Sequence, residues 1–218
     1  MQDYNPPPDN GLTVIYQDET LLVLDKPSGL LSVPGRGPGK QDSLLTRARR
    51  LFADAECVHR LDMETSGLMI MARGKTAQRA LNRLFEQRRI SKHYTAVVHG
   101  AVTPGAGEIR LPLICDWPNR PRQVVDHVLG KPSATRFRVL QHDRHRNATR
   151  VSLQPLTGRS HQLRVHMQSL GHSILGDPLY SAPGAASQAP RLMLHASAIA
   201  FRHPRSGLAS HFFSRAPF

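Results

Sequence analysis

The sequence predicts an α+β fold built on a mixed, mainly antiparallel sheet, and two observations support this class. Short strand-like apolar segments recur along the 218 residues, and only three segments have the spacing of amphipathic helices. Several of the strand-like segments follow one another with no helix between them. Such an order favours an antiparallel or mixed sheet over a regular alternation of strand and helix.

The first quarter of the chain is predicted to hold two strands, a loop and a helix. LTVIY and LLVLDK read as strands joined by the polar turn QDET. Residues 26–40 are rich in Gly and Pro, so we expect a loop there. Asp42 or Ser43 then caps a helix that carries Arg47 and Arg50 on its outer face. The apolar positions of this helix are Leu44, Leu45, Ala48, Leu51 and Phe52.

The middle and end of the chain are predicted to supply the remaining elements. GLMIMA reads as a buried strand, and a second amphipathic helix follows with Ala77, Ala80, Leu81, Leu84 and Phe85 inward. HYTAVVHG, EIRLPLICD, SATRFRVLQ and ATRVSLQPL are the next strands. TGRSHQLRVHMQSLGH begins as a turn and becomes a helix ending at Gly171. RLMLHASAIAF and ASHFFS close the chain as strands, after a loop at 176–191 that is the best candidate for a mobile segment.

The charge of the chain indicates a polyanionic partner. There are 29 Lys and Arg residues against 16 Asp and Glu, which gives a formal net charge of +13. A field of this size favours nucleic acid. Two cysteines without a CxxC motif fit a reducing cytoplasm, and the sequence shows neither a signal peptide nor an apolar run of bilayer length. We therefore expect a soluble cytoplasmic protein that does not use a membrane.

One carboxylate stands out against this basic background. Asp62 lies in HRLDMETSG, residues 59–67, between two predicted buried strands. An acid on an RNA-facing surface would repel phosphates, which suggests that Asp62 has a chemical role. An aspartate in a loop more often forms a turn or a surface ion pair, and the residues alone leave that alternative open. The neighbouring side chains can all form hydrogen bonds: His59, Arg60, Thr65 and Ser66.

The segment HRLDMETSGLMIMA closely resembles the signature of the RluA family of pseudouridine synthases, in which the Asp of HRLDxxTSG is catalytic. The likeness continues along the chain. DKPSGLLSVPG resembles the first motif of the family, KHYTAVVHG its tyrosine segment, and LTGRSHQLRVHM its arginine-bearing motif. LPLICDWPNRP and GKPSATRF resemble the branch of the family that modifies both 23S ribosomal RNA and tRNA.

The resemblance implies that the protein isomerises uridine to pseudouridine in structured RNA, after flipping the nucleotide out of its stack. Asp62 would be the catalytic carboxylate, either as a nucleophile or as a base toward the sugar, and the sequence leaves both routes open. Arg164 would keep Asp62 ionised, and Tyr94 would stack on the target uracil. No cofactor is expected, because the reaction involves no net redox change. The substrate-binding residues implied are Arg60, His59, Thr65, His161, Arg159 and Lys26.

Without the resemblance, two of these residues have simpler interpretations. Helical spacing alone describes Arg164 as an arginine on a helix surface. Strand alternation places Tyr94 with Ala96 and Val98, where a tyrosine usually belongs to a hydrophobic core.

The resemblance also implies the organisation of the chain and its partners. We expect an extended arm over residues 1–11 and a single catalytic domain over residues 12–218, with the site in a central cleft and no S4-type module. The expected partners are stem-loops of rRNA and tRNA, without DNA or membrane, for a monomeric protein. Basic side chains would hold the RNA backbone without reading its sequence: Arg47, Arg50, Arg79, Arg83, Arg120 and Arg122.

Two other functions compete with this one. A ribonuclease could use His59 with His161 or His166 as acid and base. A basic RNA-binding protein without catalysis is the third possibility. A metal site is not expected, because the five-residue spacing of His161 and His166 is wrong for HExxH and no acidic cluster or CxxC completes a ligand set.

Overall fold

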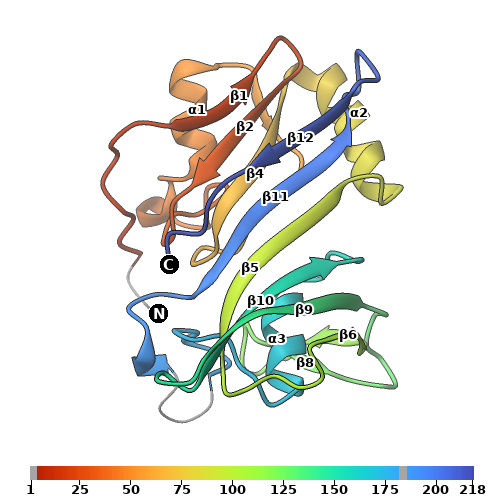
Figure 1. The fold of residues 1–218 in the computed structure, drawn as a ribbon. Helices are drawn as coiled ribbons and strands as arrows, with labels where there is room; N and C mark the ends of the chain where they lie inside the picture. The colour runs from red at the N-terminus through yellow and green to blue at the C-terminus, as the bar shows by residue number, and fades with distance from the viewer. Residues whose placement is uncertain (1–3, 182–185) are drawn as a thin grey trace. The chain divides into compact units, whose positions relative to one another are not determined.

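The computed structural model describes residues 4–181 and 186–218 (Figure 1). The chain divides into two compact units. Unit 1 comprises residues 1–92 and 195–217, and unit 2 comprises residues 93–194 with residue 218. The single catalytic domain expected over residues 12–218 stays a prediction.

Unit 1 is built on a mixed sheet. Its strands are β1 (Thr13–Gln17), β2 (Leu21–Lys26), β3 (Ala55–Cys57), β4 (Ser66–Arg73), β11 (Leu194–Arg202) and β12 (Ala209–Phe213). The strands run in the order β1-β2-β4-β11, with β3 also on β4 and β12 also on β11. These pairs are antiparallel, except that β4 and β11 run parallel where Ser66 and Gly67 face His195 and Ala196. The predicted α+β class with a mixed, mainly antiparallel sheet is confirmed in this unit.

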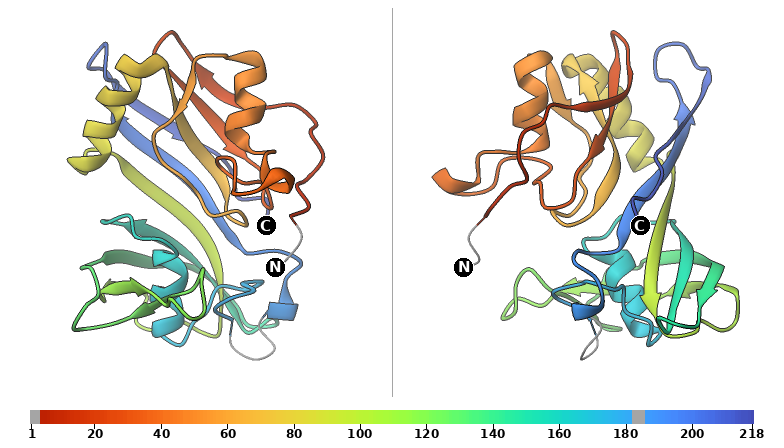
Figure 2. Two further views of the ribbon diagram at one scale, coloured as in Figure 1. Left: turned by 180° about the vertical axis from the view of Figure 1, so that it is seen from behind. Right: turned by 60° about the vertical axis from the view of Figure 1, so that its left-hand side comes forward.

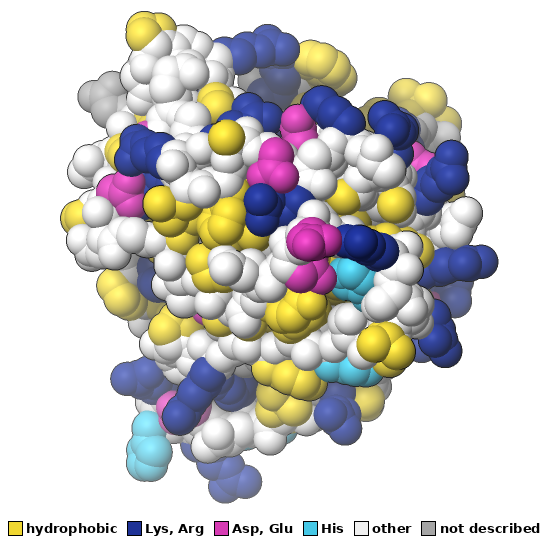
Figure 3. Space-filling model, turned by 90° about the horizontal axis from the view of Figure 1, so that it is seen from above, with side chains coloured by type: hydrophobic (Ala, Val, Ile, Leu, Met, Phe, Trp, Pro, Cys, Tyr) yellow, Lys and Arg dark blue, Asp and Glu magenta, His cyan; other side chains and the backbone are white. Residues whose placement is uncertain are grey.

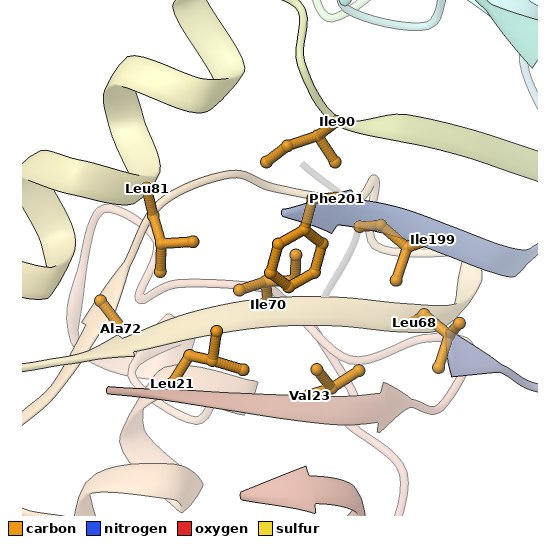
Figure 4. Packing of buried hydrophobic residues seen from close by; sticks show 9 residues of the cluster. All are labelled: Leu21, Val23, Leu68, Ile70, Ala72, Leu81, Ile90, Ile199 and Phe201. Carbon is orange, nitrogen blue, oxygen red and sulfur yellow. The ribbon is translucent and has the colours of Figure 1, made fainter. Parts of the chain in front are cut away.

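The core of unit 1 lies between this sheet and the helix α2 (Gly74–Glu86). Figure 4 shows apolar side chains of β2, β4, β11 and α2 gathered together. β4 is the most buried strand of this unit, because residues 66–72 are all buried. β2 pairs along one of its edges, and β3 pairs with residues 71–73 on the other. The cluster consists of Leu21, Val23, Leu68, Ile70, Ala72, Leu81, Ile90, Ile199 and Phe201.

The first helix, α1 (Leu44–Leu51), begins where its capping residue predicts. The Ser43 side chain accepts a hydrogen bond from the Thr46 N–H at 3.1 Å, which satisfies one of the unpaired donors of the first turn. Two predictions for this helix are wrong. Leu51 was expected inward and is 68% exposed, whereas Arg47 was expected outward and is 5% exposed.

Arg47 is buried because the N-terminal arm covers it. Its guanidinium bonds the Asp42 carboxylate at 2.7 and 2.9 Å and the carbonyl of Pro7 at 2.6 Å. Residues 4–12 contain neither helix nor strand, and residues 1–3 lie outside the described chain. The extended arm expected over residues 1–11 stays a prediction. Helical spacing on α1 alone could not reveal a segment almost 40 residues away.

Unit 2 contains an antiparallel sheet and a separate hairpin. The strands β5 (Ser91–His99), β10 (Ala148–Pro155), β9 (Ala134–Asp143) and β6 (Ala106–Arg110) pair in that order. β7 (Leu113–Cys115) and β8 (Gln123–Val125) form the hairpin. The helix α3 (Gln162–Ser169) packs against β8, β9 and β10, and the views of Figure 2 show it against one face of the sheet. As predicted, this helix ends before Gly171, which has a φ of 82°.

The segment EIRLPLICD was predicted as one strand and instead forms parts of two. The break falls at Leu111 and Pro112, between β6 and β7. Proline cannot donate to a strand ladder, which explains the interruption. The three-residue strands β3 and β8 were not predicted, because so short a segment shows no periodicity.

Two 3₁₀ turns are the remaining helical elements of the described chain. The 3₁₀ turns η1 (Pro38–Lys40) and η2 (Ala186–Gln188) lie in the predicted loops, and residues 182–185 of the second loop are outside the described chain. Its predicted mobility stays a prediction. Within the described residues, none of the helices has both the length and the apolar character to cross a bilayer.

Candidate active site

Asp62 lies in the connection between β3 and β4 of unit 1. The main chain turns there, with the Thr65 N–H donating to the Asp62 carbonyl at 3.1 Å. The Asp62 side chain is partly exposed, Arg60 is exposed and Thr65 is buried. The segment therefore has a defined turn, with its basic residue on the surface.

The loop that follows β2 fixes the main chain on both sides of Asp62. The Ser32 hydroxyl donates to the Leu61 carbonyl at 2.7 Å and accepts from the Leu61 N–H at 3.1 Å. On the other side, the Ser28 hydroxyl donates to the Glu64 carbonyl at 2.6 Å. Two sequence motifs that resemble separate family signatures thus form one hydrogen-bonded structure.

Lys26 is the charged residue at the centre of this structure. Its side chain is fully buried, and its ammonium donates to the carbonyls of Pro27, Leu30 and Met63 at 3.0, 2.7 and 2.9 Å. An ammonium has three donors, so these bonds provide an acceptor for each. Met63 directly follows Asp62, so the contacts of Lys26 are those of a positioning residue. The substrate contact predicted for Lys26 stays a prediction.

His59 supports the same segment from the other end. Its Nε2 accepts a hydrogen bond from the Ile70 N–H at 2.9 Å, and its ring packs on Phe85 with the ring centroids 4.6 Å apart. On this edge of β4, β3 pairs with residues 71–73 and β11 with residues 66–67, so the imidazole supplies the acceptor that Ile70 would otherwise lack.

The charge state of His59 follows from these surroundings. Burial, and then the positive charge of Lys92, lowers the pKa of His59 to about 3. A neutral ring also agrees with an Nε2 that accepts a hydrogen bond. His59 is therefore poorly suited to act as the acid or base of a ribonuclease.

A series of side-chain hydrogen bonds lies at the start of β4, and the sequence analysis did not find it. Ser66 and His195 are buried, and Ser214 and Asp25 are half-buried. The Ser66 hydroxyl bonds His195 Nδ1 at 2.9 Å, and His195 Nε2 bonds the Ser214 hydroxyl at 3.0 Å. The Ser214 hydroxyl in turn donates to the Asp25 carboxylate. Since Ser214 donates to Asp25, His195 Nε2 carries the proton that it gives to Ser214. These hydrogen bonds join β2, β4 and β11 next to the Asp62 segment.

Gly67 makes this junction possible. Its φ is +109°, and a Cβ atom added there would lie 2.4 Å from the Ala196 carbonyl oxygen. Only glycine permits this backbone conformation together with the close approach of β11. The last two residues of the HRLDMETSG motif therefore have structural roles. Ser66 takes part in this series of hydrogen bonds, and Gly67 leaves room for β11.

In unit 2, Tyr94 lies on β5 opposite Leu153 of β10. It is 9% exposed, and Ala96 and Val98 on the same face are fully buried. The predicted alternation of this strand is confirmed. Tyr94 thus sits at the end of a row of small and branched core residues.

Arg164 is buried on α3, with 1% exposure. The simple interpretation of a surface arginine is therefore wrong. Its Nε and Nη2 atoms donate to the two Asp177 carboxylate oxygens, each at 2.7 Å. The Asp177 side chain is also fully buried and accepts from the Leu179 and Tyr180 N–H groups. Sequence analysis missed Asp177, which lies in the segment read as a loop.

Tyr180 is the second residue of unit 2 that the sequence analysis missed. Its hydroxyl accepts from the Gln123 N–H and bonds His161 Nδ1, both at 2.7 Å. The centre of the Arg164 guanidinium lies 5.1 Å from the centroid of the Tyr180 ring, within cation–π range. The structure therefore brings His161 and Arg164 to one buried tyrosine, as their shared motif suggests.

The turn before α3 is fixed by Gln162. Its side-chain oxygen accepts from the Thr157 hydroxyl at 2.7 Å and the Arg159 N–H at 3.0 Å. Arg159 itself is exposed. His161 has a φ of 52°, an uncommon left-handed conformation for a residue other than glycine. Such backbone strain is frequent where a side chain is held for function.

His166, the other histidine considered for a ribonuclease, is fully buried. It bonds Thr135, Ser133 and the Leu111 carbonyl, and burial lowers its pKa. Its contacts are those of a structural residue. Within residues 4–181 and 186–218, no group of three or more His, Cys, Asp or Glu residues is arranged to hold a metal ion.

The basic charge is distributed over the surface. Figure 3 shows one face, on which Lys and Arg side chains occupy many separate positions with Asp and Glu among them. Arg47 is the exception among the arginines predicted to hold RNA, because it is buried. Arg122 is half-buried, and the others are exposed: Arg50, Arg79, Arg83 and Arg120.

Comparison with known proteins gives concordant results. Residues 20–169 match the family model described as RNA pseudouridylate synthase. The chain is 50% identical over 218 residues to the dual-specificity RNA pseudouridine synthase RluA of Escherichia coli strain K12, covering 100% of this chain and 99% of the relative. The protein of the same name from Haemophilus influenzae is 50% identical over 216 residues, with coverage of 99% and 98%.

Among solved structures, the human RNA pseudouridylate synthase domain containing 1 has a similar fold. The TM-score is 0.82 at 29% sequence identity, and the match covers 98% of this chain and 87% of the human one.

Proposed function

Because this chain belongs to the RNA pseudouridylate synthase family and is an RNA pseudouridine synthase, we propose that Asp62 is its catalytic residue and that rRNA and tRNA stem-loops are its substrates. The observation that carries the assignment is the Asp62 segment, whose main chain is fixed on both sides by Ser32, Ser28 and Lys26. A nucleophile or base acts efficiently when it is held in place before the substrate arrives.

The chemistry requires that uracil leave C1′, rotate and rejoin through C5. A glycoside hydrolase generally needs two carboxylates, one of which protonates the leaving group while the other attacks or activates water. Here the leaving base is retained and relinked, so a single carboxylate is sufficient. Asp62 either forms a covalent intermediate or removes a sugar proton.

Tyr94 and Arg164 complete the proposed catalytic set. We propose that the Tyr94 ring, which is 9% exposed at the edge of the unit 2 core, stacks on the target uracil. The Arg164 guanidinium, held by Asp177, supplies positive charge in one fixed orientation. The side chains proposed to bind the substrate are Arg60, Thr65, His161 and Arg159. For His59 and Lys26, which were also predicted to bind it, we propose that they position the Asp62 segment.

The substrate proposal rests on charge and on the named relatives. A net charge of +13 suits phosphate contacts, which position an RNA without reading its bases. Unpaired loops lower the cost of extruding the target nucleotide, because their bases are already partly unstacked. The relatives are named as dual-specificity RNA pseudouridine synthases. The motifs of this chain that resemble the rRNA- and tRNA-modifying branch of the family support rRNA and tRNA as its two substrate classes.

The assay uses uridine tritiated at C5 in transcripts of tRNA and of large-subunit rRNA. Pseudouridine formation releases tritium and leaves the RNA length unchanged. A ribonuclease would shorten the RNA, and a passive RNA-binding protein would cause neither change. Release from only one of the two transcripts would overturn the dual-substrate proposal and retain the catalytic one.

Tyr94→Phe tests the role of the tyrosine hydroxyl. The variant keeps the ring, so RNA binding should stay within a few-fold, while tritium release slows if the hydroxyl assists proton removal at C5. An unchanged rate would limit Tyr94 to stacking or packing.

A further inference from the structure

Trp117 is a large aromatic residue on the surface of unit 2, with 64% exposure. It lies in the turn that joins β7 to β8, and it is the one tryptophan of the whole sequence. Isolated exposed apolar residues are common and by themselves need no explanation. The contacts around Trp117 are the reason to assign it a role.

The turn that carries Trp117 is rigid. The Asn119 N–H donates to the Asp116 carbonyl at 3.0 Å, the Arg122 N–H donates to the Asn119 carbonyl at 3.0 Å, and the Asp116 N–H donates to the Arg122 carbonyl at 2.9 Å. The Asn119 side chain also bonds the Asp116 carboxylate. An exposed aromatic ring on a preformed turn loses little conformational entropy when a ligand binds.

The indole also has a cation next to it. The Arg120 guanidinium lies 4.6 Å from the centroid of the Trp117 ring, and Arg120 Nε donates to the Trp117 carbonyl at 3.1 Å. An aromatic ring beside a guanidinium is the arrangement with which proteins bind single-stranded nucleic acid: the base stacks and the cation meets the backbone.

The hairpin formed by β7 and β8 is bound to Tyr180, the residue whose ring lies against Arg164. The Gln123 N–H at the start of β8 donates to the Tyr180 hydroxyl, and the Tyr180 ring lies against both Arg122 and Arg164. A base stacked on Trp117 is therefore held at a defined position relative to α3 within unit 2.

We propose that Trp117, with Arg120 beside it, is a stacking platform for an unpaired base of the RNA substrate other than the target uridine. The proposal rests on the proposed function and extends it to a second contact. The occupant is RNA because the surroundings are cationic and the enzyme acts on RNA. An apolar protein partner would leave the two neighbouring guanidinium groups without anions.

Intrinsic fluorescence tests this directly, because all tryptophan emission comes from this position. Titration with a tRNA anticodon stem-loop should quench the emission, because a base would stack on the indole. A blunt duplex of the same length without a loop should quench much less. Unchanged emission at RNA saturation, verified by the anisotropy of labelled RNA, would overturn the proposal, as would equal quenching by the duplex. Emission that depends on protein concentration without RNA would also overturn it, in favour of contact with a second copy.

Two variants separate this contact from the catalytic proposal. Trp117→Ala should weaken stem-loop binding and lower kcat/KM by about tenfold, the usual loss for one stacked base. Val128→Ala, at a residue of unit 2 that is 89% exposed, should leave both unchanged. If Trp117→Ala bound the stem-loop with the affinity of the wild type, the stacking platform would be overturned. Continued tritium release would then leave the catalytic proposal intact. Absence of release from the wild type would overturn the substrate proposal, whatever the fluorescence result.

Discussion

Asp62 in unit 1 and Arg164 in unit 2 are held in place by different kinds of interaction. The Asp62 segment is fixed through main-chain carbonyls, to which two serine hydroxyls and the Lys26 ammonium donate. Arg164 is fixed through its own side chain, by a bidentate ion pair with the buried Asp177. The first arrangement fixes the main chain that carries Asp62, whereas the ion pair fixes the orientation of a side-chain charge.

The difference predicts where each region is vulnerable. Removing one member of a buried ion pair leaves an uncompensated charge, which is among the most damaging single changes. Removing one hydrogen bond of several around a segment costs less, but it shifts the segment that carries the reactive group. A change at the Arg164 ion pair of unit 2 should therefore lower the free energy of unfolding more. A change around the Asp62 segment should lower the catalytic activity more.

Asp177→Asn should produce the largest loss of stability. The amide keeps the shape of the side chain but removes the Asp177 charge that pairs with Arg164 in a fully buried site, so we expect a loss of about 3–5 kcal/mol in the free energy of unfolding. Urea denaturation measures it. The matched control is Asp54→Asn, which removes a partly exposed pair with Arg73 and should cost less than about 1 kcal/mol. Equal losses in the two variants would contradict the role given to Asp177.

Lys26→Met should have the next largest effect on stability and a larger one on activity. The variant keeps the length of the side chain but removes the donor to three carbonyls, two in its own loop and one at Met63. We expect a loss of about 2–3 kcal/mol on unfolding, since the carbonyls are left without this partner. Tritium release should slow more than RNA binding weakens, because the change acts on the position of Asp62. A fall in RNA affinity that accounts for all of the lost activity would instead favour direct substrate contact by Lys26.

The effect of His59 is the smallest of the three at neutral pH, and it grows as the pH falls. Its folded-state pKa of about 3 lies below the ordinary value of 6.5. The unfolded chain therefore binds a proton as the pH falls through 6.5 while the folded chain does not. The stabilising effect of the neutral ring is present above 6.5 and is lost toward pH 3, by up to about 1.4 kcal/mol per pH unit.

His59→Gln should make the unfolding free energy less dependent on pH between about pH 6.5 and pH 4.5. Glutamine can still accept from the Ile70 N–H. Some dependence should persist, because burial also lowers the pKa of His166. His145→Gln, at an exposed position, is the control and should leave the wild-type slope unchanged. An identical slope in His59→Gln would mean that His59 takes up its proton in the folded protein.

The parts of the fold that the sequence predicted are those that depend on local pattern. The cap at Ser43, the buried strand at 67–72 and the end of α3 before Gly171 each depend on a few consecutive residues. The failures involve distant partners. Arg47 was misplaced because helical spacing cannot reveal the arm that covers it.

The same distinction holds for the candidate site. Asp62, Tyr94 and Arg164 were proposed from motifs, each of which is a continuous segment. Asp177 and the chain from Ser66 through His195 and Ser214 to Asp25 were missed, because their partners lie far apart in sequence. Nothing local distinguishes Asp177 from a turn-forming aspartate beside a proline.

The most direct test of the central claim, that the Asp62 carboxylate performs the chemistry, is tritium release by Asp62→Asn with the enzyme in excess over RNA. We expect no release above background and an RNA affinity within about threefold of the wild type, because phosphate contacts dominate binding. Asp54→Asn, at an exposed carboxylate of the same unit, should release tritium at the wild-type rate. Release by Asp62→Asn at a rate similar to the wild type would contradict the claim.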